Sequence, residues 1–174
     1  MNRGKFIALE GGEGAGKSTQ ARLLAEALRA RGQACAITRE PGGTAGAEAI
    51  RALLLGTEGE GWHPRAEALL FAAARSDHVE RLIVPALERG EWVICDRFVD
   101  SSRAYQGGGG GLSDADVLDL HRIGGRDASY HAAVAAAFRR FADAEPARFA
   151  RIGGDGSPDQ VHAVVMDVLE PILP

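Results

Sequence analysis

Eight residues near the start of the chain have the types and the spacing of a phosphate-binding loop. Residues 11–18 read Gly-Gly-Glu-Gly-Ala-Gly-Lys-Ser and fit the pattern GxxxxGK[ST]. Glycines in such a loop let backbone N–H groups converge on an anion, and the N-terminus of a following helix adds positive potential. Lys17 can reach the β- and γ-phosphates of a nucleotide, and the Ser18 hydroxyl can ligate Mg²⁺. The spacing therefore predicts binding of a nucleoside triphosphate with Mg²⁺.

A second set of polar residues follows two later segments that are predicted to be strands. Residues 38–44 read Thr-Arg-Glu-Pro-Gly-Gly-Thr, and Asp96 and Arg97 directly follow an apolar run. Arginines at positions 39, 51, 75 and 97 around one sheet edge predict a second phosphorylated ligand, because a guanidinium matches phosphate geometry. Beside a phosphate-binding loop, a carboxylate that follows a strand, such as Asp96, is expected to associate with Mg²⁺.

Phe71 and Arg75 lie four residues apart, which places both on one face of a predicted helix. This spacing suits a planar ring that stacks on Phe71 and whose edge is hydrogen-bonded by Arg75. Simpler interpretations of the same residues stay open. Phe71 also suits a hydrophobic core, Arg75 a solvated helix face, and Asp96 with Arg97 a local ion pair.

The segments around these residues alternate between strand and helix patterns. Apolar runs predict strands at 5–10, 34–38, 92–95 and 148–152. Helices are predicted at 18–30, 47–55, 64–89, 113–123, 128–144 and from 158 onward. Pro85 should kink or break the long third helix, and the glycine run at 107–111 should be mobile. The fold class is therefore α/β, a doubly wound parallel sheet flanked by helices in a single domain over residues 1–174, with ligands at the carboxyl ends of the strands.

The composition narrows the classes of partner. The 174 residues carry a formal net charge of −4, which indicates neither nucleic-acid nor membrane binding. No apolar run approaches a membrane span, the N-terminus lacks a signal-peptide pattern, and a cytoplasmic location is expected. Cys35 and Cys95 are expected to be reduced and structural, and the five histidines show no metal-ligand spacing.

Together these segments resemble the thymidylate kinase family, which consists of P-loop nucleoside monophosphate kinases. The resemblance rests on residues 10–19, 39–44, 50–54, 71–75 and 96–98, together with Ser102, Tyr105 and Gln106. It is continuous over residues 4–123 and weaker from 126 to the end. It implies transfer of the γ-phosphoryl group of ATP to dTMP, giving dTDP and ADP, with Mg²⁺. It also implies a homodimer packed through the helix at 64–89, which carries more alanine and leucine than one buried face requires.

The resemblance implies a role for each matching position. The residues expected to bind the ATP phosphates are Gly11, Gly12, Glu13, Gly14, Ala15, Gly16, Lys17, Ser18 and Thr19. The residues expected to bind dTMP are Arg39, Glu40, Pro41, Arg51, Phe71, Arg75, Arg97, Ser102, Tyr105 and Gln106. The expected catalytic residues are Lys17, Arg97, Glu13 and Asp96, and the expected metal ligands are Ser18 and Asp96.

For the residues expected to bind dTMP, the resemblance implies separate contacts to the phosphate, the base and the sugar. Arg97, helped by Arg51 and Arg39, is implied to bind the phosphate. Phe71 is implied to stack on thymine while Arg75 bonds its carbonyl, and Ser102 meets the pyrimidine edge near Gln106. Tyr105 is implied to crowd the 2′ position of the sugar, and Glu13 to lie near its 3′-hydroxyl.

The chain departs from the family's pattern at two places. Some members carry an arginine in the loop where this chain has Gly14, and members without it use arginines of a mobile lid after the fourth strand. Here no apolar strand separates Ile123 from Arg126, so one strand and the lid, about 30 residues, are missing between them. Either the segment is deleted from the chain, or the sequence is incomplete at this point.

Two other functions stay open beside phosphoryl transfer to dTMP. The chain could be a kinase for another nucleoside monophosphate, although the loop without proline and the set Phe71, Arg75 and Ser102 favour thymine. It could also be a nucleotide-binding protein without turnover, which the missing lid motivates.

Overall fold

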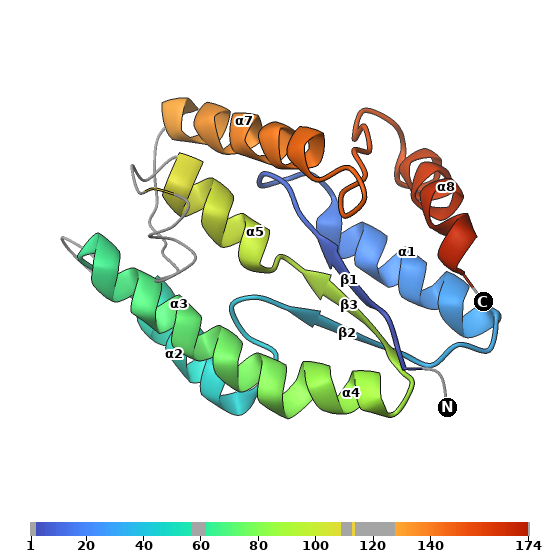
Figure 1. Cartoon of the computed structure of the whole chain (residues 1–174), viewed down its shortest axis with the longest axis horizontal. Coiled ribbons are helices and arrows are strands. Elements are labelled where there is room, and N and C mark those ends of the chain that lie inside the picture. The colour runs from blue at the N-terminus through green and yellow to red at the C-terminus, as the bar shows by residue number, and fades with distance from the viewer. Residues whose placement is uncertain (1–2, 57–61, 109–112, 114–127, 174) are drawn as a thin grey trace.

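The computed structural model describes residues 3–56, 62–108, 113 and 128–173, and over these ranges the chain alternates between strands and helices (Figure 1). The first half contains β1 (Phe6–Leu9), α1 (Lys17–Ala30), β2 (Cys35–Arg39), α2 (Ala45–Leu55), α3 (Pro64–His78), the π-helical turn η1 (Val79–Ile83) and α4 (Val84–Glu88). The second half contains β3 (Trp92–Asp96), α5 (Val99–Ser102), the π-helical segment η2 (Arg103–Gly108), α7 (Ala128–Ala144), α8 (Pro158–Leu169) and the 3₁₀ turn η3 (Glu170–Ile172).

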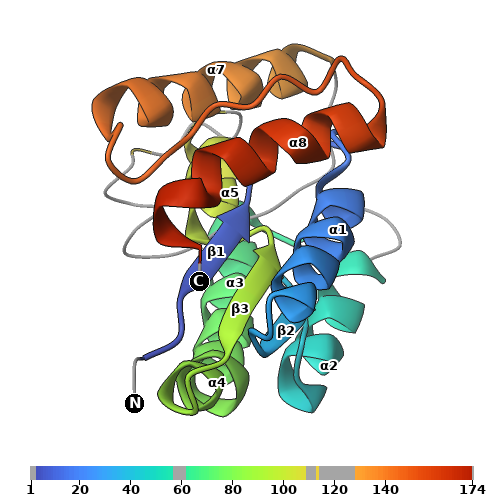
Figure 2. The same cartoon turned by 90° about the vertical axis from the view of Figure 1, so that its right-hand side faces the viewer.

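The three strands form one parallel sheet in the order β1-β3-β2. Phe6 of β1 and Ala36 of β2 both pair with Val93 of the central strand. Parallel neighbours need crossover connections, and α1 and the run from α2 to α4 supply them on the two faces of the sheet (Figure 2). The α/β fold predicted from the sequence is confirmed. Because all three strands point the same way, the polar residues that follow them meet at one edge.

The core lies on both sides of β3. Trp92 and Ile94 of this strand pack against Leu24 of α1, whereas Val93 packs against Ile83 on the opposite face. Successive side chains of a strand point to opposite faces, so burial on both faces explains why β3 is apolar without alternation. The central strand is thus fixed from both sides, and its carboxyl end, where Asp96 lies, is rigidly placed.

The long helix at 64–89, for which the sequence predicts a kink or break at Pro85, instead changes its winding just before this residue. The helix α3 continues into the π-helical turn η1 and then into α4, whose second residue is Pro85. Proline has no N–H, and its ring would clash with the carbonyl oxygen four residues earlier in a regular α-helix. The wider π turn avoids this clash while the helix keeps its general direction.

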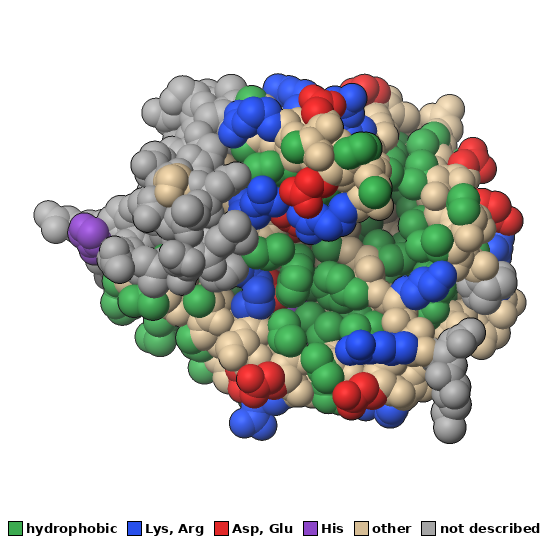
Figure 3. All heavy atoms as spheres, viewed as in Figure 1, with side chains coloured by type: hydrophobic (Ala, Val, Ile, Leu, Met, Phe, Trp, Pro, Cys, Tyr) green, Lys and Arg blue, Asp and Glu red, His purple; other side chains and the backbone are tan. Residues whose placement is uncertain are grey.

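The strand predicted at 148–152 is wrong, since this segment belongs to no strand. A strand needs a neighbour about 4.8 Å away to complete its hydrogen bonds. Instead, a cavity of about 530 Å³ lies between Phe149 and Ile152 on one side and Phe6 and Leu9 of β1 on the other. Figure 3, viewed as in Figure 1, shows hydrophobic side chains gathered in a hollow at the middle of the molecule. Among the described residues, β1 therefore has a strand on one side only.

Some predictions fall on residues outside the described ranges. The helix predicted at 113–123, apart from Ser113, and the gap between Ile123 and Arg126 both lie there, as does part of the glycine run. Both cysteines are free thiols, as expected. Within the described ranges, no helix has the length and apolar character to cross a membrane.

Candidate active site

The phosphate-binding loop connects β1 to α1 in the conformation that its glycines allow. Gly14 and Gly16 have φ values of 73° and 78°, a left-handed region that residues with a side chain rarely adopt. Gly16 is the residue before the first turn of α1, so the free N–H groups of that turn face the loop. Lys17 is the first helical residue, and its Nζ donates to the Gly12 carbonyl oxygen at 2.7 Å. The loop thus presents backbone donors and one ammonium group at the carboxyl end of β1.

Lys17 is partly buried and lies near charged groups of both signs. Burial lowers its pKa, and the positive charge of Arg97 adds to this effect, while Asp96 and Glu10 oppose it. A desolvated ammonium group beside a second cation is poorly compensated by the protein alone. An anionic ligand placed between Lys17 and Arg97 would relieve this repulsion, which is the electrostatic condition for phosphate binding.

Two oxygen ligands suited to a hard cation meet beside the loop. The Ser18 hydroxyl donates to the Asp96 carboxylate at 2.5 Å, although the two residues are far apart in sequence. Ser18 belongs to the first turn of α1, and Asp96 ends the central strand. Mg²⁺ takes oxygen donors and usually keeps several waters. The described residues hold no cluster of three or more His, Cys, Asp or Glu that suits a metal. A cation that needs only one or two protein oxygens fits this pair.

A cavity of about 220 Å³ opens next to the loop, and most of the residues expected to bind dTMP line it. The lining combines cations, aromatic rings and small polar groups. Its residues are Glu13, Glu40, Pro41, Arg51, Leu55, Phe71, Arg75, Arg97, Phe98, Ser101, Ser102 and Tyr105. The structure therefore brings together side chains from the loop, the end of β2, α2, α3, the end of β3, α5 and η2.

A buried polar network holds the base-recognition candidate Arg75. Its Nε donates to the Glu40 carboxylate at 2.5 Å, and its Nη2 donates to the Ser102 hydroxyl at 3.0 Å. The other Glu40 oxygen lies 3.1 Å from His78 Nδ1, and His78 Nε2 lies 2.7 Å from the Thr38 hydroxyl. All five side chains are buried. Arg75 is thus neither a solvated charge nor a surface ion pair, because the network fixes its guanidinium at the cavity wall.

Arg97 stands between the loop and the cavity. Its Nη1 donates to the Gly11 carbonyl oxygen at 3.0 Å and to the Ser101 hydroxyl at 3.2 Å. Its guanidinium lies 4.9 Å from the centroid of the Tyr105 ring. Among the described residues, Arg97 donates to Gly11 and Ser101 and makes no ion pair with the neighbouring Asp96, so the local ion-pair interpretation has no support. This arginine is positioned to meet an anion shared by the loop and the cavity.

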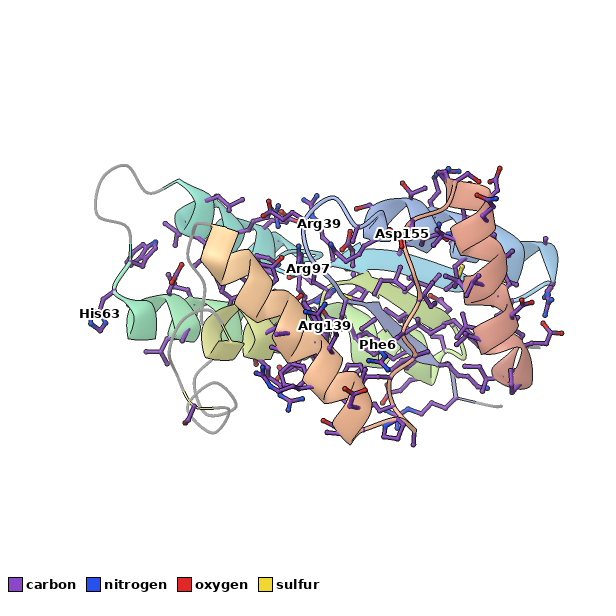
Figure 4. All side chains as sticks on the ribbon, turned by 90° about the horizontal axis from the view of Figure 1, so that it is seen from above. Phe6, Arg39, His63, Arg97, Arg139 and Asp155 are labelled. Carbon is purple, nitrogen blue, oxygen red and sulfur yellow. The ribbon has the colours of Figure 1, made fainter. Side chains whose placement is uncertain are left out.

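Two of the expected dTMP residues are not placed at this cavity. Arg39 makes an ion pair with Glu48 at 3.1 Å, half exposed, and faces a different hollow that Ser18 and Asp96 also line. Figure 4 labels Arg39 and Arg97 at the ends of neighbouring strands of the sheet. The side chain of Gln106 lies outside the described part of the chain, as only its backbone in η2 is described.

Sequence reasoning missed three polar residues that support the site. Glu10 follows β1, its oxygens accept hydrogen bonds from Phe98 N and Ser101 N, and burial raises its pKa to about 7. Ser101 joins Glu10 to Arg97, and His78 joins Glu40 to Thr38. The sequence does carry a signal for Glu10, because this carboxylate directly follows an apolar run, as Asp96 does. His78 and Ser101 carried no comparable signal.

A nucleotide-phosphate loop at the carboxyl end of a parallel sheet, with an arginine-lined cavity against it, defines a P-loop kinase acting on a small phosphorylated acceptor. Residues 9–125 match the family model described as thymidylate kinase. The chain belongs to the thymidylate kinase family, whose members transfer a phosphoryl group from ATP to dTMP.

Several relatives resemble the chain over nearly its whole length. The thymidylate kinase of Rhizorhabdus wittichii is 50% identical over 206 aligned positions, covering 98% of this chain and 99% of the relative. The thymidylate kinase of Gluconobacter oxydans is 45% identical, covering 98% of this chain and 96% of the relative. The solved thymidylate kinase of Ehrlichia chaffeensis superposes with a TM-score of 0.83 at 34% identity, covering 96% of this chain and 99% of that one.

The first of these alignments also bears on the missing segment. It has 206 positions and covers almost all of both proteins, whereas this chain has 174 residues. The relative therefore contains residues inside the aligned region that have no counterpart here. This agrees with the absence of a strand and a lid expected from the sequence, and with the three-stranded sheet of the described residues.

Proposed function

We propose that this chain catalyses phosphoryl transfer from Mg²⁺-bound ATP to dTMP with the loop at 11–19 as the donor site and the 220 Å³ cavity as the acceptor site. The observation that carries the proposal is the shared wall of the two sites. Glu13 of the loop and Arg97, which bonds to the loop, both line the cavity. A donor and an acceptor bound there would have their phosphates adjacent, which supplies the proximity that phosphoryl transfer requires.

On the donor side, the backbone N–H groups of the loop and the ammonium group of Lys17 would bind the β- and γ-phosphates. Ser18 and Asp96 would hold Mg²⁺. When bound, Mg²⁺ neutralises charge on the donor phosphates. An oxygen of the acceptor phosphate then attacks the γ-phosphorus, the bond to the bridging β–γ oxygen breaks, and ADP leaves with that electron pair.

On the acceptor side, Arg97 and Arg51 would bind the dTMP phosphate. Arg51 Nη1 donates to the Pro41 carbonyl oxygen at 2.9 Å, which aims its guanidinium at the cavity wall. Arg39 would have to release Glu48 before it could help. Glu13 is exposed at the loop and would meet the 3′-hydroxyl of the sugar.

Base selection would rest on the buried side of the cavity. Phe71 would stack on thymine, Arg75 would donate to its carbonyl, and Ser102 would meet the pyrimidine edge with Gln106 nearby. Tyr105 would crowd the 2′ position and so favour deoxyribose. Because Glu40 and His78 fix Arg75, the hydrogen-bond pattern offered to the base is rigid, which is the condition for discrimination.

The test is a substrate panel on purified protein whose intact mass has been measured. We expect turnover or binding with dTMP to exceed that with other nucleoside monophosphates, and Phe71→Ala to weaken this preference while phosphate contacts persist. Lys17→Ala should nearly abolish turnover and weaken ATP binding. An unaltered substrate ranking in Phe71→Ala would reduce that side chain to a core residue. Wild-type ATP affinity in Lys17→Ala would contradict the donor-site assignment.

We also propose that two copies of the chain pack through α2 and α3. Leu53, Leu55 and Leu69 on these helices are among the large hydrophobic side chains that stay exposed, with 52%, 66% and 53% of their surfaces accessible. A two-fold contact would cover them. Light scattering at micromolar concentration should return a dimer. The single domain over 1–174 and the cytoplasmic location stay predictions from the sequence.

A further inference from the structure

Glu10 connects the end of β1 to the start of α5, although it does not line the 220 Å³ acceptor cavity. It follows β1 directly and precedes the first glycine of the loop. One of its oxygens accepts from Phe98 N at 2.9 Å and Ser101 N at 3.1 Å, and the other accepts from the Ser101 hydroxyl at 2.5 Å. A single carboxylate thus ties the start of α5 to the end of β1.

Ser101 passes this restraint on to Arg97. Its hydroxyl has one hydrogen, which Glu10 accepts, so its oxygen is left as an acceptor. Arg97 Nη1 donates to that oxygen at 3.2 Å and to the Gly11 carbonyl oxygen at 3.0 Å. Glu10 therefore sets the direction of the Ser101 hydroxyl, and the hydroxyl direction decides whether Ser101 can accept from Arg97.

Arg97 needs such support because of its backbone. Its φ is +71°, and it is the one residue other than glycine with a positive φ among those that the structure describes. A side chain in this region costs about 1–3 kcal/mol and persists only where the surroundings determine it from several sides. The contacts with Leu9, Gly11, Ser101 and Tyr105 do so here.

We propose that Glu10 is a positioning residue for phosphoryl transfer, acting through the Ser101 hydroxyl to orient the Arg97 guanidinium toward the acceptor phosphate. This inference rests on the proposed role of Arg97 at the dTMP phosphate. Glu10 makes no contact with the substrate in this scheme. Its effect is to keep one donor of Arg97 on Ser101 and Gly11, which leaves the rest of the guanidinium facing the cavity.

The test replaces the carboxylate by its neutral isostere. In Glu10→Gln, the amide oxygen still accepts from the α5 backbone, but the amide N–H₂ group faces the Ser101 hydroxyl as a donor. The Ser101 oxygen then accepts a hydrogen bond from the new amide, and its own hydrogen no longer points at residue 10. This hydrogen can turn toward Arg97, which weakens the hydrogen bond that Arg97 Nη1 donates to Ser101. We expect the Kd of dTMP, measured by calorimetry above pH 7, where Glu10 is a carboxylate, to rise about fivefold, the usual worth of one hydrogen bond. The Kd of ATP should change less.

Matched variants separate positioning from simple stabilisation. Ser101→Ala should weaken dTMP binding to a similar extent, the Glu10→Gln/Ser101→Ala double variant should be no worse than either single variant, and Ser101→Thr, which keeps the hydroxyl, should restore binding. Glu91→Gln is the control, because Glu91 pairs with Arg89 at the opposite end of β3. A variant that loses thermal stability but keeps the wild-type Kd of dTMP would overturn the proposal.

A second readout does not depend on dTMP. The guanidinium NMR signals of Arg97, assigned through Arg97→Lys, should shift or broaden in Glu10→Gln and stay unchanged in Glu91→Gln. If the wild-type chain binds no dTMP, the proposed function fails, and these signals still decide the inference. Unchanged Arg97 signals in Glu10→Gln would show that Glu10 does not control this side chain.

Discussion

At the scale of single residues, Arg97 carries the clearest consequence. We expect Arg97→Ala to weaken dTMP binding by about 1.5–3 kcal/mol, the usual worth of a hydrogen bond to a charged group, and to change ATP binding much less. Alanine also has a Cβ, so the strain of the positive φ is retained and the difference reports the guanidinium. Calorimetry with each nucleotide measures the effect.

The matched control for Arg97→Ala is Arg22→Ala. Arg22 pairs with Glu26 on the exposed surface of α1 and should leave both affinities unchanged. Equal loss of ATP and dTMP binding in Arg97→Ala would point to a damaged loop instead of a lost acceptor contact.

Glu10 also predicts how stability depends on pH. Its pKa rises from 4.5 to about 7 in the folded chain, mainly through burial, so the folded chain holds a proton that the unfolded chain releases. The free energy of unfolding that Glu10 contributes is therefore greatest below about pH 4.5 and falls as the pH rises toward 7, by at most about 1.4 kcal/mol per pH unit. Neutral Glu10→Gln removes this titration.

The measurement is the difference in unfolding free energy between wild type and Glu10→Gln, followed by denaturant titration from pH 4.5 to 8. Taking the difference cancels the opposite slopes of carboxyls whose pKa is lowered, such as Glu48 and Asp77. The variant should gain stability relative to wild type as the pH rises. A constant difference across this range would mean that Glu10 keeps an ordinary pKa.

The sequence predicts residues that stand at the positions of a recognisable motif. It does not predict the roles of residues that act through a neighbouring side chain. The loop, Arg51, Phe71, Arg75 and Arg97 were found in this way, although their roles stay predictions. Glu10, Ser101 and His78 act on other side chains, so their roles emerge from the folded arrangement, although the position of Glu10 directly after an apolar run is visible in the sequence. Arg39 shows the opposite case, because a local ion pair with Glu48 competes with the predicted role.

At the scale of elements, the start of α8 is set by residues close together in the sequence. Ser157 accepts from Gln160 N at 3.3 Å, and the Gln160 side chain accepts from Ser157 N at 2.8 Å, which forms a capping box ahead of α8. Ser157→Ala should destabilise the protein by about 1 kcal/mol. Thermal unfolding measures this, with Ser157→Thr, which keeps the oxygen, as the control that should stay near wild type.

The strand predicted at 148–152 is the element prediction that did not hold within the described residues, and its failure has a physical reason. Helix caps, turns and the change of winding before Pro85 depend on residues close in sequence, so local sequence signals predict where they occur. A strand depends on a neighbour that the chain must supply elsewhere. Phe149 and Ile152 have a strand pattern, but the cavity beside β1 leaves them without a ladder partner.

At the scale of the whole molecule, the cavity beside β1 and the alignment with the Rhizorhabdus wittichii relative both indicate that a segment next to β1 is missing. The free side of β1 faces about 530 Å³ of space, lined by apolar residues of β1, α8 and the segment after α7 and, at its polar part, by Glu10, Lys17, Asp100 and Arg148. The Rhizorhabdus wittichii relative has residues inside the aligned region that this chain lacks. A strand placed in that space would pair with β1 and cover the apolar wall, and both changes stabilise a sheet.

Catalysis should depend on the same missing segment. Gly14 offers no arginine to the transferred phosphoryl group, and Arg97 and Arg51 are proposed to bind the acceptor phosphate. An arginine at the transition state is worth about 10³–10⁵ in rate. We therefore expect the 174-residue chain to bind nucleotides weakly and turn over slowly. A chimera that inserts the relative's extra residues between Ile123 and Arg126 should be active and should unfold at a higher temperature.

The comparison requires both proteins to be confirmed by intact mass and assayed in the same coupled kinase assay. A second chimera, in which the arginines of the inserted segment are replaced by glutamine, separates the two effects, since it should keep the gain in stability and lose the gain in rate. Turnover by the 174-residue chain in the ordinary range for kinases, about 1–100 s⁻¹, would show that an arginine already present does the work of the missing segment. Arg103, whose guanidinium donates to Asp100 and Glu145, would then be the first candidate to replace.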